Sequence, residues 1–194
     1  REGGFKGPYD SDTAFHEPFA FFGFAAAVTE RIELVTTVLI LPQRQTVLVA
    51  KQAAEVALLS NNRLRLGVGT GWNKVEYQAL NEDFTNRGRR QEEQVELMRT
   101  LWTSDAFSYE GQYHTIEKAS INPRPTKPVP IWFGGSAPAL LQRCARLGDG
   151  WLASAYNTTP ETFAAAWRRL QEQLCQAGKD PDRFPNAIAT MFYY

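Results

Sequence analysis

Three closely spaced glycines make the stretch LRLGVGTGWNKVEY, residues 64–77, the first candidate for chemistry in this sequence. Gly67, Gly69 and Gly71 form the pattern G-x-G-x-G after an apolar run that is typical of a buried strand. A dinucleotide-binding loop requires G-x-G-x-x-G, because its last glycine lets a helix pack closely on a strand. Trp72 occupies that last position, so we do not expect a dinucleotide loop. The glycines predict a strand end at which a ligand can approach the main chain.

A second candidate is the tetrapeptide FGGS, residues 133–136, which runs from a predicted strand into a predicted helix. Gly134 and Gly135 leave main-chain amides uncovered, the helix start adds positive potential, and Ser136 adds a hydroxyl. Such a cradle suits a phosphate group. The alternative is an ordinary strand-to-helix turn in which Ser136 caps the helix. Taken alone, the tetrapeptide favours the ordinary turn, because short motifs often occur without function.

Other polar residues give weaker signals. Thr36 and Thr37, near the end of a predicted strand, could offer hydroxyls to a ligand, although threonine is also an ordinary strand residue. Glu76 could be a site carboxylate, but a solvated helix surface is its more common setting. The segment RGRRQEEQ, residues 87–94, is typical of the salt-bridged start of a helix.

Histidines and cysteines are few in this sequence. His16 and His114 are the only histidines, and their separation indicates neither a metal site nor a Ser–His–Asp arrangement. Cys144 and Cys175 lack C-x-x-C or metal-ligand spacing. We therefore expect two reduced structural thiols in a cytoplasmic protein, and no metal.

The composition indicates one soluble globular domain spanning residues 1–194. The chain is 43% hydrophobic and 22% charged, and its formal net charge is zero. Because there is no excess of basic residues, we expect no nucleic acid and no anionic membrane as a partner. No apolar stretch approaches the length of a transmembrane helix, and the N-terminus lacks the apolar core of a signal peptide.

Strand and helix patterns alternate along the chain, with a hairpin expected at 107–116. Alternation of this kind predicts a parallel sheet, since parallel neighbours need a helical crossover. An open doubly wound sheet and an arc of a (β/α)8 barrel both fit, and both bind ligands at the carboxyl ends of their strands. The five expected strands, in sequential order, are 32–39, 64–69, 129–133, 151–153 and 187–193.

Several longer segments together resemble the bacterial luciferase-like monooxygenase family. These segments are LVTTVLILPQR, RLGVGTGWNKVEY, RGRRQEEQVELMRTLW, FSYEGQYH and PRPTKPVPIWFGGSAPALLQRCARLGDGW. The resemblance implies an α/β fold of the (β/α)8 TIM-barrel type. It also implies FMN or the deazaflavin coenzyme F420 as cofactor, a small-molecule substrate, and a homodimer when the chain is complete.

The resemblance also assigns the candidate cofactor-binding residues. Gly69, Thr70 and Gly71 would line the cofactor ring, beside a non-proline cis peptide between Thr37 and Val38. The turn at 134–136 would bind the phosphate, which reverses the preference for an ordinary turn. Trp72 departs from relatives that act on sugar phosphates, because these place glutamate at this position.

A complete barrel of this type needs about 250 residues, so the resemblance implies an incomplete chain of about five strands. The first two strands and the eighth would lie outside residues 1–194, and we therefore name no catalytic residue. We expect a flavin- or deazaflavin-dependent oxidoreductase, and within that class a monooxygenase. The alternative is a non-catalytic flavin-binding protein with a shortened barrel, and an open-sheet nucleotide-binding module is disfavoured by the failed dinucleotide pattern.

Overall fold

The computed structural model describes residues 12–155 and 158–189. The helices are α1 (Pro18–Val28), α2 (Thr46–Leu59), α3 (Lys74–Ala79), α4 (Arg87–Thr103), α5 (Pro138–Leu147) and α6 (Pro160–Gln176), with 3-10 turns at Leu41–Gln43 and Pro181–Arg183. The strands are β1 (Leu34–Val35), β2 (Leu39–Ile40), β3 (Leu64–Gly69), β4 (Phe107–Glu110), β5 (Thr115–Ala119), β6 (Ile131–Gly134), β7 (Gly150–Ser154) and β8 (Asn186–Ala189).

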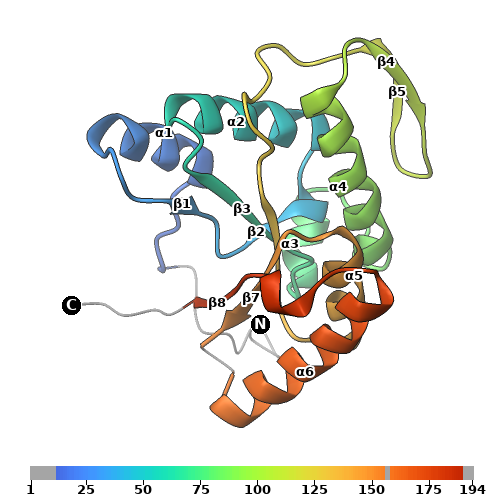
Figure 1. Ribbon diagram of the computed structural model, residues 1–194. Coiled ribbons are helices and arrows are strands. Elements are labelled where there is room, and N and C mark those ends of the chain that lie inside the picture. The colour runs from blue at the N-terminus through green and yellow to red at the C-terminus, as the bar shows by residue number, and fades with distance from the viewer. Residues whose placement is uncertain (1–11, 156–157, 190–194) are drawn as a thin grey trace.

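The main sheet is parallel throughout, and its strands follow the order of the chain. Its order is β1-β3-β6-β7-β8, and β2 also pairs with β3. The helices α1, α2, α4, α5 and α6 follow one another along an arc outside these strands (Figure 1). This arrangement is a half-barrel, so the predicted incomplete (β/α)8 architecture is confirmed. No described helix has the length and apolar character that crossing a bilayer requires.

The core lies between the sheet and its helices. Leu66 and Val68 of β3, and Ile131 and Phe133 of β6, are completely buried. Each pair is two residues apart, so its members point to the same face of the sheet. Against them pack the apolar stripes of α2, α4 and α5, whose buried members include Val49, Ala53, Val95, Met98 and Leu141.

Two predicted strands differ from the structure. The strand expected at 32–39 is divided into β1 and β2, because the main chain leaves the sheet between Thr36 and Val38. The peptide between Thr37 and Val38 is cis, which confirms that expectation. The strand expected at 187–193 is present as β8 up to Ala189, and residues 190–193 lie outside the described part.

The β4–β5 hairpin, predicted at 107–116, is confirmed and is fastened to α4 by one carboxylate. Glu93 Oε1 accepts hydrogen bonds from His114 Nδ1 at 2.8 Å and from the Tyr113 amide at 2.9 Å, and Oε2 accepts one from the Gln112 amide. His114 Nε2 lies 2.6 Å from Thr46 Oγ1, at the start of α2. The hairpin therefore joins two helices through a half-buried polar network.

This network predicts an acid-sensitive hairpin. Burial raises the pKa of Glu93, but the hydrogen bonds from His114, Tyr113 and Gln112 outweigh it and leave the pKa below its usual range. A lowered carboxyl pKa stabilises the fold above the pKa of an unfolded glutamate, and that stability is lost as pH falls through the lower folded pKa. We expect the amide protection factors of residues 107–119 to fall between about pH 5 and pH 3. In Glu93→Gln, protection should be low already at neutral pH and nearly independent of pH, so an unchanged acid transition in this variant would contradict the prediction.

Candidate functional site

Sheet pairing brings the three predicted cofactor-binding segments to one edge. Ile40 pairs with Gly69, Val68 pairs with Phe133, and Gly134 pairs with Leu152. The bulge at 36–38, the loop at 69–71 and the turn at 134–136 therefore lie at the carboxyl ends of neighbouring strands. In barrels and open sheets of this kind, this edge is where ligands bind.

Val38 is the residue around which these segments pack. A Cβ atom added at Gly69 would lie 2.5 Å from Val38 Cγ2, and one added at Gly134 would lie 2.3 Å from Val38 Cγ1. Both distances are far below ordinary contact. Only glycine at these two positions leaves room for the Val38 side chain. This packing role was not apparent in the sequence.

The two candidate threonines differ in what they can offer a ligand. Thr36 is only 5% exposed, and its hydroxyl donates a 2.7 Å hydrogen bond to the Gly67 carbonyl. In this conformation its side chain fixes β1 to β3. Thr37 is exposed, so it is the member of the pair whose hydroxyl can reach a bound molecule.

The loop at 69–71 is held by a buried tyrosine. Tyr77 of α3 is completely buried, and its hydroxyl donates a 2.6 Å hydrogen bond to the Thr70 carbonyl. Burial raises the pKa of Tyr77 to about 12, so the phenol remains a neutral donor at physiological pH. Gly71 adopts a φ of +65°, which suits glycine, and the following Trp72 is 53% exposed.

The turn at 134–136 has the character of an anion cradle. Gly135 has a φ of +125°, its amide donates to the Leu152 carbonyl, and its carbonyl accepts a 2.7 Å hydrogen bond from Trp151 Nε1. Within the described residues, the amides of Ser136 and Ala137 donate to no acceptor. Free amides at the start of a helix create positive potential, which suits a phosphate group.

The alternative role of Ser136 as a helix cap is wrong. The N-cap of α5 is Ala137, which makes no side-chain capping bond, and Pro138 begins the helix. Ser136 is exposed and lies one residue before the cap. The helix therefore begins one residue later than the spacing of the tetrapeptide indicated.

The remaining polar candidates have structural partners. Glu76 accepts hydrogen bonds from Gln43 Nε2 at 3.0 Å and from Asn73 Nδ2 at 2.9 Å. The salt-bridged helix start expected at 87–94 is confirmed, with Arg90 paired to Glu82 and Glu92 paired to arginines of α5. Across the described part of the chain, no three metal-ligating side chains gather in one place.

The two cysteines are expected to differ in reactivity. Both are free thiols; Cys144 is buried, and burial raises its pKa to about 12, whereas Cys175 is exposed. Since the thiolate is the reactive form, we expect a disulfide reagent at pH 8 to modify one thiol per native chain and two per unfolded chain. Cys175→Ser should abolish the native signal, and fast modification of that variant would contradict the assignment.

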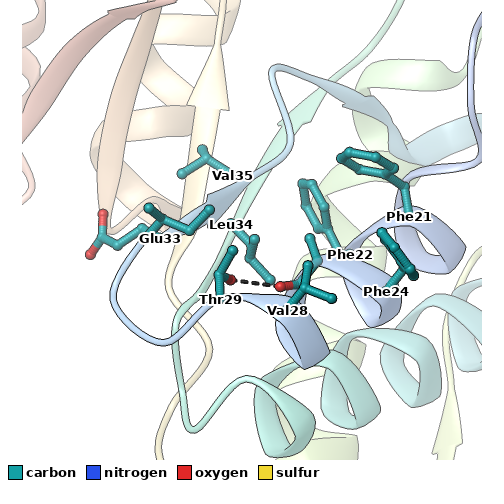
Figure 2. Close-up of a pocket in the computed structure, with 10 residues that line it drawn as sticks. Phe21, Phe22, Phe24, Val28, Thr29, Glu33, Leu34 and Val35 are labelled. Atoms are coloured by element: carbon teal, nitrogen blue, oxygen red, sulfur yellow. Dashed lines mark hydrogen bonds between the residues drawn. The ribbon is translucent and has the colours of Figure 1, made fainter.

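An apolar groove lies beside α1, and neither the 69–71 loop nor the 134–136 turn lines it. It has a volume of about 500 Å³ and runs between α1 and the segment leading into β1. Figure 2 shows the rings of Phe21, Phe22 and Phe24 on one side and Leu34 and Val35 on the other. Because its lining is almost wholly apolar, the groove offers no counterpart for a phosphate, and we do not assign the cofactor to it.

Comparisons with known proteins agree with this geometry. The sequence model of the luciferase-like monooxygenase family matches residues 2–194. A protein of Mycobacterium tuberculosis without an assigned activity is 40% identical over 166 residues, which cover 85% of this chain and 56% of that protein. The F420-dependent glucose-6-phosphate dehydrogenase of Nocardia farcinica is 40% identical over 186 residues, which cover 92% and 55% of the two chains.

Two further relatives differ in cofactor. The FMNH2-dependent dimethylsulfone monooxygenase of Pseudomonas fluorescens is 32% identical over 137 residues, covering 69% of this chain and 37% of that protein. The solved structure of an F420-dependent secondary alcohol dehydrogenase, in complex with an F420-acetone adduct, superposes with a TM-score of 0.84 at 26% identity and covers 93% and 56% of the two chains. This chain thus spans about half the length of the relatives that it matches. The family match over nearly all residues leads to one conclusion: the chain belongs to the luciferase-like monooxygenase family.

Proposed function

We propose that this chain forms the cofactor-binding part of an oxidoreductase that uses FMN or coenzyme F420 on a small organic substrate. The observation that carries the proposal is the meeting of the 37–38 bulge, the 69–71 loop and the 134–136 turn at one sheet edge. When bound, the cofactor would supply the hydride or oxygen chemistry, and the protein would bind it, orient it and exclude water.

The residues present fit such a cofactor. FMN and F420 both carry a flat ring system and, at some distance from it, a phosphate group. The Ser136 and Ala137 amides would hold the phosphate, because they have no acceptor within the described residues and stand at the start of α5. Thr37, Val38 and the main chain at Gly69, Thr70 and Gly71 would lie against the ring.

Relatives that use either cofactor support the proposal of a flavin- or deazaflavin-dependent oxidoreductase. One of these relatives is an F420-dependent glucose-6-phosphate dehydrogenase, and another is an FMNH2-dependent dimethylsulfone monooxygenase. Within the class, we propose monooxygenation as the activity, with F420-dependent dehydrogenation as the second candidate, which the 40% identity to a dehydrogenase favours. The homodimer expected from the resemblance stays a prediction.

The test is to express the full gene product and titrate it with FMN and with F420, following absorbance and fluorescence. We expect tight stoichiometric binding of one cofactor. Substrate-dependent oxygen uptake with reduced flavin would then indicate a monooxygenase, whereas reduction of F420 by an alcohol would indicate a dehydrogenase. Binding without any turnover would favour the flavin-binding alternative, and absence of binding to both cofactors would overturn the proposal.

Glucose 6-phosphate is expected to be a poor substrate. Trp72 stands where sugar-phosphate relatives are expected to place a glutamate, and its exposed indole supplies apolar surface instead of a charge. We therefore expect glucose 6-phosphate to be oxidised at least about 100-fold less efficiently than a small apolar alcohol, measured as kcat/KM with F420. A tryptophan in place of a glutamate removes a charged hydrogen-bonding partner from the site. Comparable efficiencies for the two substrates would contradict this prediction.

A further inference from the structure

Two buried aromatic side chains hold the main chain at the two ends of the proposed cofactor site. Tyr77 donates through its hydroxyl to the Thr70 carbonyl at 2.6 Å, and Trp151 donates through its indole nitrogen to the Gly135 carbonyl at 2.7 Å. Both side chains are completely buried. They belong to different elements, α3 and β7, and no motif in the sequence pairs them.

Each of these hydrogen bonds also fixes the amide that follows the carbonyl. A trans peptide is planar, and its C=O and N–H point in opposite directions. Thr70–Gly71 and Gly135–Ser136 are trans, since the cis peptides of the described chain are those after Thr37 and Asn122. The Gly71 amide therefore points away from Tyr77, and the Ser136 amide points away from Trp151.

Both amides are left without an acceptor among the described residues. Within the described residues, neither the Gly71 nor the Ser136 amide donates a hydrogen bond to another residue. An alternative conformation with the carbonyl turned outward is accessible to glycine-containing turns. It would present an acceptor where a cofactor phosphate or a ring oxygen needs a donor.

We propose that Tyr77 and Trp151 are positioning residues that set the direction of two cofactor-facing amides. Tyr77 orients Gly71 toward an oxygen or nitrogen acceptor of the ring, and Trp151 orients Ser136 toward the phosphate. This inference rests on the proposed function and deepens it, because it states which main-chain donors recognise each end of the cofactor.

The variants are Tyr77→Phe and Trp151→Phe, each of which removes the donor and keeps an aromatic ring. We expect Tyr77→Phe to weaken cofactor binding about 5- to 10-fold, as for the loss of one hydrogen bond. It should also shift the absorption maximum of the bound ring and lower its reduction potential, because a donor to the ring stabilises the negative charge of the reduced form. Trp151→Phe should reduce the preference for the phosphorylated cofactor over the same ring without phosphate, riboflavin in the case of FMN.

Matched controls separate positioning from stability. Tyr113→Phe also removes a phenol hydroxyl, but the Tyr113 hydroxyl is buried and has no partner in the described part of the chain. Trp102→Phe removes an indole that donates to the Ala50 carbonyl at 2.9 Å, between α2 and α4. Both controls should leave the spectrum, the reduction potential and the phosphate preference unchanged, even where they alter the melting temperature.

The wild-type titration separates a failure of the positioning roles from a failure of the proposed function. If the wild type binds its cofactor and Tyr77→Phe and Trp151→Phe match their controls, the positioning roles are wrong while the proposed function stands. If the wild type binds neither cofactor, both are overturned. If a variant unfolds below the assay temperature, the test is the NMR chemical shifts of the Gly71 and Ser136 amides in the wild type. Both shifts should change when the cofactor is added, and unchanged shifts would overturn the inference.

Discussion

Gly135→Asp is expected to lower cofactor affinity by about 100- to 1000-fold. The φ of +125° at this position is one that side chains rarely adopt, and an added Cβ would lie 3.1 Å from Leu140 Cδ1. The added carboxylate would stand beside the amides that are proposed to hold the cofactor phosphate. Two negative charges about 4 Å apart repel by roughly 4 kcal/mol near a protein surface, which corresponds to the upper end of this range.

The control for this experiment is Gly135→Asn, which introduces a side chain of the same size and the same backbone strain without the charge. Binding constants of both variants, measured by fluorescence titration, should separate the strain from the electrostatic repulsion. We expect the asparagine variant to bind at least about 10-fold more tightly than the aspartate variant, and the difference to shrink at high ionic strength. Equal affinities in the two variants would contradict the assignment of the cofactor phosphate to this turn.

Gly67→Ala is expected to destabilise the fold by about 4 kcal/mol or more, among the largest effects of a single methyl group. A Cβ at this position would lie 1.9 Å from the Thr36 carbonyl oxygen and 2.6 Å from Leu152 Cδ1. The carbonyl belongs to the main chain and cannot rotate away. Since Thr36 also donates its hydroxyl to the Gly67 carbonyl, the methyl group would separate β1 from β3 where they are joined.

The matched control is Gly23→Ala in α1, where an added Cβ meets nothing within 4 Å. There the alanine should stabilise the helix by about 0.5–1 kcal/mol, because glycine costs more conformational entropy on folding. Denaturant unfolding of the full gene product would measure both variants. A Gly67→Ala variant as stable as the wild type would show that the strands can separate without cost, and would contradict the packing described here.

The local part of this fold could be read from the sequence because its signals are local. The apolar run at 64–69 became β3 with the same bounds, and the hairpin expected at 107–116 formed as β4 and β5. Alternation of strands and helices gave the parallel order, since parallel neighbours need crossovers. The glycine-rich strand ends were correctly placed at one edge for the same reason.

The packing of the candidate site depends on contacts between residues that are far apart in the chain. The break in the strand at 32–39 places Val38 between Gly69 and Gly134, and no pattern within the strand itself encodes that contact. Glu93 belongs to the salt-bridged helix start expected at 87–94, but it is half-buried under a hairpin that begins 14 residues later at Phe107. Likewise, Tyr77 and Trp151 hold the turns of the candidate site through hydrogen bonds that only the assembled half-barrel brings within reach.

The sequence by itself thus determined the elements and their order, because backbone propensity and hydrophobic period act over a few residues. Only the tertiary structure decided which side chains fix the site, because their partners meet only when separate strands and helices pack together.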